Sequence, residues 1–113
     1  MSFVEVCKLV DVPNPGALAV VAGGVPVAVV HDGDGGLHAL RDICSHADVA
    51  LSEGEVDGCT LECWLHGSRF DLRTGQPSGP PATSSVPVYA VRVDGEGDDA
   101  VVLVDVTVNA ARR

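Results

Sequence analysis

Two short motifs in this chain place a cysteine next to a histidine, a combination that binds metal. The first runs from Cys44 to His46 with one residue between them, and the second from Cys63 to His66 with two between them. Two cysteines and two histidines can hold a zinc ion or a two-iron, two-sulfide cluster. Classical zinc sites group Cys with Cys and His with His. Because each motif here mixes the two ligand types, the order favours a cluster in which the two cysteines bind one iron and the two histidines the other.

The spacing C-x-H followed by C-x-x-H resembles that of Rieske [2Fe–2S] proteins, and the residues downstream agree with it. Gly67 and Ser68 follow the second motif directly, and a proline-rich stretch spans Pro77 to Pro81. Over essentially its whole length the chain resembles the Rieske ferredoxins of bacterial ring-hydroxylating oxygenases. We therefore expect one [2Fe–2S] cluster per chain.

The resemblance implies that Cys44, His46, Cys63 and His66 ligate this cluster, with both histidines at the surface as the exit route for the electron. Two ferric ions and two sulfides carry a charge of about +2, which two thiolates cancel while neutral imidazoles add nothing. The reduced site then reaches only about −1. Such sites have reduction potentials of about −150 to +300 mV, against about −400 mV for plant-type ferredoxins with four cysteines.

Residues around the motifs predict a potential near the low end of that range. In high-potential relatives each ligand loop carries an additional cysteine, and the two form a disulfide; the matching positions here are Val49 and Leu65. Those relatives also use Ser and Tyr hydroxyls as hydrogen-bond donors to sulfur. Ser68 matches the serine, whereas Phe70 stands at the tyrosine position without a hydroxyl. Because each donor favours the more negative reduced state, losing one lowers the potential.

Three further residues are expected to support the cluster from outside the ligand set. Gly67 would let the backbone approach the cluster closely. Pro80, with Pro81, would form a stiff loop behind the cluster. Trp64, the only tryptophan, has two open interpretations: a shield or docking anchor beside the cluster, or a loop residue packed on the rest of the domain.

The remaining cysteines and histidines lie outside the motifs. We interpret Cys7 and Cys59 as small half-buried thiols rather than as a disulfide or extra ligands. His31 and His38 flank a predicted hairpin turn and are expected to be ordinary partnered side chains.

The composition predicts a single all-β domain over residues 1–113. Valine is abundant, aromatic residues make up 4%, and 13 Gly and 7 Pro favour short strands and turns. No window shows helical periodicity, which predicts an antiparallel β-sandwich or barrel. The resemblance adds that a cluster-binding subdomain, about residues 42–81, is inserted into this base. The predicted strands are Phe3–Leu9, Gly16–Ala22, Val25–His31, Leu37–Arg41, Glu55–Val56, Cys59–Glu62, Ser68–Leu72, Val86–Val93 and Ala100–Val108.

Charge and hydropathy restrict the partners. The net charge of −9 argues against nucleic acid and anionic membranes, and suits transient docking on a basic patch of a protein. No apolar stretch approaches the roughly 20 residues that span a bilayer, and the N-terminus lacks the features of a secretory signal. We expect a cytoplasmic monomer.

The resemblance implies a soluble one-electron carrier rather than an enzyme. It would pass electrons from an NAD(P)H-dependent flavoprotein reductase to a terminal non-haem iron oxygenase. A 2-His-1-carboxylate catalytic site needs further histidines, and only His31 and His38 are left. The alternatives are an accessory subunit similar to the small subunit of nitrite reductase, a module associated with iron–sulfur assembly, or a structural zinc module.

Overall fold

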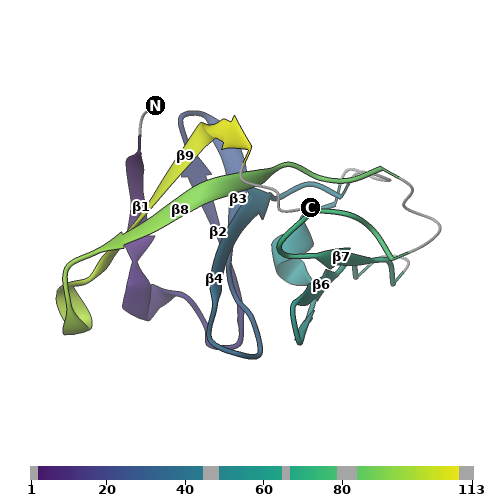
Figure 1. Cartoon of the computed structure of the whole chain (residues 1–113), viewed down its shortest axis with the longest axis horizontal. Coiled ribbons are helices and arrows are strands. Elements are labelled where there is room, and N and C mark those ends of the chain that lie inside the picture. Colours follow the sequence, from purple (N-terminus) through teal and green to yellow (C-terminus); the bar gives the residue numbers. More distant parts are fainter. Residues whose placement is uncertain (1–2, 45–48, 65–66, 79–83, 110–113) are drawn as a thin grey trace.

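A computed structural model describes residues 3–44, 49–64, 67–78 and 84–109. These residues form nine β-strands and three short 3-10 turns, with no α-helix among them (Figure 1). The strands are β1 (Val4–Lys8), β2 (Gly16–Ala22), β3 (Val25–His31), β4 (Leu37–Arg41), β5 (Val56–Asp57), β6 (Thr60–Glu62), β7 (Arg69–Asp71), β8 (Val88–Asp94) and β9 (Val101–Asn109). The 3-10 turns are η1 (Leu9–Asp11), η2 (Leu51–Glu53) and η3 (Gly97–Asp99).

Six strands form one antiparallel sheet in the order β1-β9-β8-β4-β3-β2. Its two edge strands, β1 and β2, are also in contact, so the sheet curls into a nearly closed barrel. The β2–β3 hairpin pairs in register from Gly16↔His31 to Ala22↔Val25. Its two-residue turn, Gly23-Gly24, has positive φ at both positions, as a tight turn between twisted strands requires.

The second sheet has three strands in the order β5-β6-β7 and comes between β4 and β8 in the sequence. Figure 1 shows β6 and β7 at one end of the molecule, beyond β4. Two core clusters result, one inside the barrel and one between the sheets. Val29 of β3 belongs to the barrel cluster and Val30 to the other, because successive side chains point to opposite faces. Strands β3 and β4 are therefore buried on both faces.

The predicted all-β fold is confirmed, and the three strands β2, β3 and β4 have the predicted bounds. Strand β8 begins two residues later than predicted, at Val88. The reason is that the Val86 N–H donates to the Gly75 carbonyl at 2.8 Å, and the Pro87 carbonyl accepts from Arg41 at 3.0 Å. The three 3-10 turns were not predicted. Each is a single turn of three residues, too short to produce a periodic pattern.

Candidate metal centre

Cys44 and Cys63, the two predicted cysteine ligands, are buried in the same core cluster. Cys44 follows β4 after a two-residue gap, and Cys63 comes directly after β6. Only 3% of Cys44 and 1% of Cys63 is exposed. Two side chains distant in sequence thus bring sulfur into one apolar region, and two thiolates there suit the cysteine-bound iron of a [2Fe–2S] cluster.

Each of these cysteines opens a loop that is closed by the same kind of backbone hydrogen bond. The Cys44 N–H donates to the Val49 carbonyl at 3.0 Å, and the Cys63 N–H donates to the Ser68 carbonyl at 2.7 Å. Both bonds join residue i to residue i+5, so the two loops enclose the same length of chain. His46 belongs to the first enclosed segment.

The first loop is held by a buried carboxylate. Asp42, which is 6% exposed, accepts one hydrogen bond from the backbone N–H of Ser52 and another from its hydroxyl, both at 2.6 Å. The Asp42 N–H in turn donates to the Pro26 carbonyl at 3.0 Å. These bonds fasten the segment before Cys44 both to η2 and to the start of β3.

The second loop is the tip of the β6–β7 hairpin, where Glu62 pairs with Arg69. Their side chains also form an ion pair at 3.1 Å. Gly67 has φ of +79° and donates its N–H to the Cys63 carbonyl at 2.9 Å. A side chain there would be strained, so this turn conformation itself calls for glycine. The predicted close approach of Gly67 to the cluster stays a prediction.

The other predicted site residues fall into two groups. Ser68 is 3% exposed, Phe70 is fully buried in the core cluster that holds both cysteines, and half of the Trp64 surface is exposed. Packing on the domain therefore covers no more than half of Trp64. The predicted ligands His46 and His66, together with Leu65 and Pro80, lie outside the described residues.

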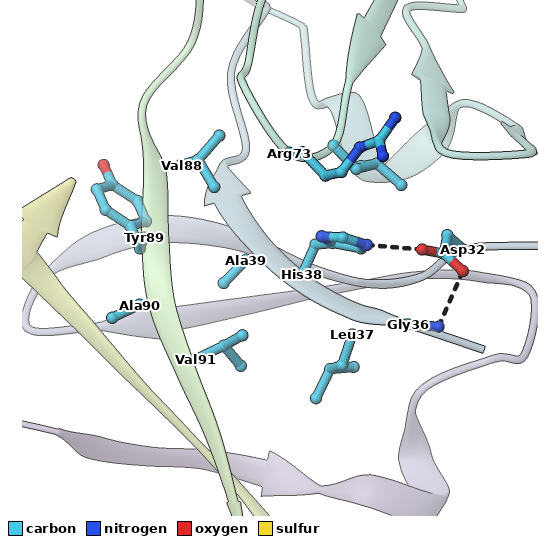
Figure 2. Close-up of a pocket in the computed structure, with 11 residues that line it drawn as sticks. Asp32, Gly36, Leu37, His38, Ala39, Arg73, Val88, Tyr89, Ala90 and Val91 are labelled. Carbon is cyan, nitrogen blue, oxygen red and sulfur yellow. Dashed lines mark hydrogen bonds and ion pairs between the residues drawn. The ribbon is translucent and has the colours of Figure 1, made fainter. Parts of the chain in front are cut away.

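The histidines outside the motifs are partnered, as expected. The Nδ1 atom of buried His31 lies 3.2 Å from the Pro13 carbonyl oxygen. The Nε2 atom of His38 lies 2.7 Å from a carboxylate oxygen of Asp32, a contact drawn in Figure 2. The sequence indicated no function for the pair formed by His38 and Asp32.

Cys7 and Cys59 are both half-buried free thiols, in agreement with their interpretation from the sequence. Cys7 packs against the barrel cluster and Cys59 against the cluster between the sheets. Burial raises the pKa of the Cys7 thiol and that of the Cys59 thiol.

Comparison with known proteins agrees with the fold and with the paired loops. Residues 2–90 match the model of the Rieske [2Fe-2S] domain. The chain belongs to the Rieske [2Fe–2S] family.

Its relatives include named ferredoxin subunits. The chain is 51% identical over 78 residues to the anthranilate 1,2-dioxygenase ferredoxin subunit of Burkholderia cepacia, covering 67% of this chain and 70% of that protein. It is 38% identical over 96 residues to the biphenyl dioxygenase ferredoxin subunit of Pseudomonas sp. strain KKS102, covering 84% of this chain and 87% of that protein.

Solved structures show the same fold. One is a chain in the complex of reduced oxygenase and oxidised ferredoxin of carbazole 1,9a-dioxygenase, with a TM-score of 0.77, 33% identity, and coverage of 90% of this chain and 92% of that one. A putative NADH-dependent nitrite reductase small subunit from Mycobacterium tuberculosis has a TM-score of 0.80, covering 95% of this chain and 97% of that one. Because its identity is 24%, this match shows likeness of fold alone.

These similarities confirm the predicted resemblance to dioxygenase ferredoxins and the single [2Fe–2S] cofactor. The related proteins are named as ferredoxin subunits, which agrees with an electron carrier rather than an enzyme. Within the described ranges, no helix is long and apolar enough to cross a membrane.

Removing the Asp42 carboxylate should destabilise the segment that leads into Cys44. We expect Asp42→Ala to lower the free energy of unfolding by about 2–4 kcal/mol, because two hydrogen bonds to a buried charge are lost. Asp42→Asn, which can still accept from the Ser52 N–H, should cost less. Urea unfolding followed by far-UV circular dichroism measures both variants. Asp34→Ala, at an exposed position, is the control. Its free energy of unfolding should lie within about 0.5 kcal/mol of that of the unmodified protein. An Asp42→Ala protein as stable as this control would contradict the anchoring role.

Proposed function

We propose that this protein carries single electrons from an NAD(P)H-dependent flavoprotein reductase to a terminal non-haem iron oxygenase. The observation that carries the proposal is a pair of buried thiols in a chain of the Rieske family. Each thiol begins a loop that is closed by its own backbone hydrogen bond between residues i and i+5. Two related proteins are ferredoxin subunits of dioxygenases, and a third occurs in a complex with an oxygenase.

Four side chains would hold the cofactor: Cys44 and Cys63 on one iron, His46 and His66 on the other. Bound there, the cluster supplies a centre that takes up and releases one electron. We also propose that residues 42–81 form the cluster-binding subdomain. In support, the three-stranded sheet lies within this range, between β4 and β8.

The described residues around the two cysteines keep water from the sulfur side of the site. Leu51, Leu61, Phe70 and Leu72 are fully buried and belong to the same core cluster as both thiols. A low-dielectric environment disfavours added negative charge, so these side chains act with the missing hydroxyl at Phe70 to hold the potential low. The buried Ser68 acts in the opposite direction if its hydroxyl donates to sulfur.

The exposed surface next to the second loop suits brief contact with a partner protein. Trp64 follows Cys63 directly and is 50% exposed, and tryptophan is among the residues that contribute most to binding at protein interfaces. The net charge of −9 would speed the approach to a basic partner surface. We propose that a monomer docks transiently through this end of the molecule, and that it works in the cytoplasm.

The alternatives have less support. Similarity to the nitrite reductase small subunit concerns the fold alone, and no described feature indicates a role in iron–sulfur assembly. A purely structural zinc module disagrees with the family to which the chain belongs.

Substituting the proposed ligands tests the site. We expect Cys44→Ser and Cys63→Ser to prevent cluster assembly, and His46→Cys or His66→Cys to change or abolish the Rieske spectrum, because the ligand type sets the electronic structure of each iron. Visible absorption, electron paramagnetic resonance and iron content are the measurements. Cys7→Ser should keep the full spectrum and two irons per chain. A Cys7→Ser protein without cluster would refute our assignment of the four ligands.

The reduction potential tests the environment of the cluster. Protein-film voltammetry at neutral pH should give a reversible one-electron wave near about −150 mV. Ser68→Ala should lower it by about 40 mV, since losing a donor that favours the reduced state by about 1 kcal/mol corresponds to that shift for one electron. The same potential in Ser68→Ala as in the unmodified protein would show that this hydroxyl does not act on the cluster.

Electron transfer with purified partners tests the function. The protein should couple NAD(P)H oxidation by a ferredoxin reductase to product formation by a ring-hydroxylating oxygenase. Trp64→Ala should raise the KM for the ferredoxin about 5- to 30-fold, because truncating an interface anchor costs about 1–2 kcal/mol, and should leave the potential unchanged. Val21→Ala, at an apolar position on β2 that is more exposed than Trp64, should leave the KM unaltered. Failure to reduce any oxygenase, despite a normal cluster, would contradict the proposed function.

A further inference from the structure

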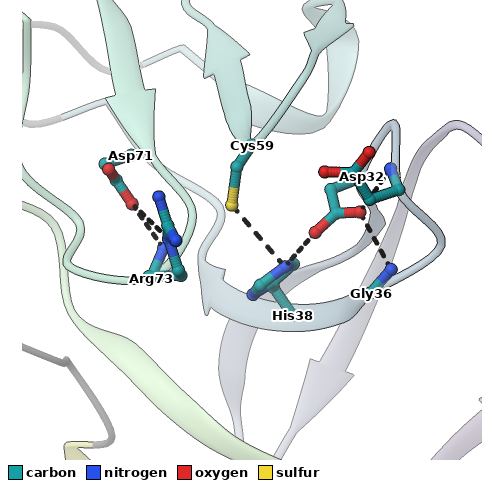
Figure 3. Close-up of polar contacts among 7 residues, drawn as sticks. Asp32, Gly36, His38, Cys59, Asp71 and Arg73 are labelled. Carbon is teal, nitrogen blue, oxygen red and sulfur yellow. Dashed lines mark hydrogen bonds and ion pairs between the residues drawn. The ribbon is translucent and has the colours of Figure 1, made fainter.

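Three side chains that the proposed electron carrier does not use meet at one point between the two sheets. The Nε2 atom of His38 lies 2.7 Å from Oδ2 of Asp32 and 3.9 Å from Sγ of Cys59. The three donor atoms all lie within 4.8 Å of one another. Figure 3 shows the thiol and the carboxylate approaching the imidazole from different sides.

The carboxylate is oriented before any ligand arrives. Oδ1 of Asp32 accepts hydrogen bonds from the backbone N–H groups of Asp34 at 2.8 Å and Gly36 at 2.9 Å, which leaves Oδ2 directed at His38. The hydrogen bond from His38, helped by those two amides against the effect of burial, lowers the pKa of Asp32 to about 2. Asp32 is therefore negatively charged at neutral pH.

The donors come from two turns that are joined by a backbone bond. Asp32 directly follows β3 and His38 lies near the start of β4, on either side of the β3–β4 turn, and Cys59 lies in the β5–β6 turn. The Gly33 N–H of the first turn donates to the Gly58 carbonyl of the second at 2.8 Å. The group thus spans the six-stranded and the three-stranded sheet.

Gly36 leaves room for the Asp32 and His38 side chains to meet. A Cβ atom at this position would lie 2.6 Å from Oδ2 of Asp32 and 3.3 Å from Nε2 of His38. Since the backbone of Gly36 does not adopt positive φ, glycine is needed here for room rather than for conformation. His38 and Asp32 also line a groove of about 540 Å³ that runs along β4 and β8 (Figure 2).

The arrangement does not match a Cys-His-Asp catalytic triad. In a triad the acid holds one imidazole nitrogen and the nucleophile contacts the other, whereas Asp32 and Cys59 both contact Nε2 of His38. The convergence of a carboxylate, an imidazole and a thiol on one point instead matches the ligand types of zinc. Calcium and magnesium prefer oxygen ligands alone.

We propose that Asp32, His38 and Cys59 bind a divalent transition-metal ion, best matched by Zn²⁺, with a fourth position open to water from the groove. The Nε2–Oδ2 pair would separate by about half an ångström to admit an ion at about 2.0 Å from each atom. The Cys59 thiol proton would pass to solvent, and His38 would bind as a neutral imidazole, with its proton on Nδ1 and Nε2 facing the ion. The thiolate and carboxylate then balance the charge of the ion.

Such an ion would join the barrel to the unit that carries the second ligand loop. Cys59 precedes Cys63 by four residues, and its carbonyl accepts from the Leu72 N–H at 2.9 Å. Arg73 lies beside the group, with its guanidinium 3.7 Å from Asp71. The site is independent of the [2Fe–2S] centre, so its test does not depend on the electron-transfer proposal.

Zinc titration of the cluster-loaded protein tests the proposal. Isothermal titration calorimetry and metal analysis after desalting should show one zinc per chain in addition to two irons. Cys59→Ser and His38→Gln should each weaken zinc binding more than about 100-fold. Changing a residue that only supports a ligand typically weakens metal binding by about 10- to 100-fold, so a larger loss indicates direct ligation. Cys7→Ser, which alters the other half-buried thiol, should bind zinc unchanged. Absence of zinc binding, equal binding by all variants, or zinc that replaces the iron would overturn the proposal.

A second measurement needs no variant and decides the matter if a substitution prevents folding. Zn²⁺ should slow the alkylation of Cys59 by iodoacetamide at least tenfold, followed by peptide mass spectrometry, because a metal-bound thiolate is shielded. Cys7 in the same sample should react at the same rate with and without zinc. Equal effects of zinc on Cys59 and Cys7 would overturn the proposal.

Discussion

The backbone hydrogen bond that closes the loop after each buried cysteine is the interaction on which the proposed site depends. A two-iron cluster needs two separate segments that present thiols at matching depth. At the proposed site, the bonds from Cys44 to Val49 and from Cys63 to Ser68 would meet this need with backbone atoms alone. Because the cysteine is the donor residue in both, the position of each thiol is tied directly to the closure.

The surrounding packing limits how these loops can move. Strands β3 and β4 contribute to both core clusters, so the barrel and the inserted sheet share one apolar layer. The carboxylate of Asp42 adds a polar fastening under the first loop. Gly54, which ends η2, lies so close to β6 that an added Cβ would collide with the Glu62 carbonyl oxygen, one residue before Cys63. Both loops therefore rest on backbone that has little freedom to shift.

The two halves of the molecule meet a second time at the β3–β4 and β5–β6 turns. There the backbone bond from Gly33 to Gly58 brings Cys59 to His38 and Asp32. A carrier must change charge while its cluster environment moves little, since movement on reduction slows electron transfer. A contact between the barrel and the three-stranded sheet at this point would oppose such movement at the proposed site. Occupancy of the proposed zinc site would strengthen the contact without touching the redox centre.

Local patterns in the sequence determined much of this protein. The mixed order of cysteine and histidine indicated the cofactor, because ligand type and spacing are properties of short segments. Strands β2, β3 and β4 had the predicted bounds, since valine-rich runs between glycine turns specify strands locally. Only the tertiary structure decided the partners of Asp42, the start of β8, and the meeting of Asp32, His38 and Cys59. Those features depend on which turns pack against each other, and a contact between residues far apart leaves no periodic or compositional trace in either segment.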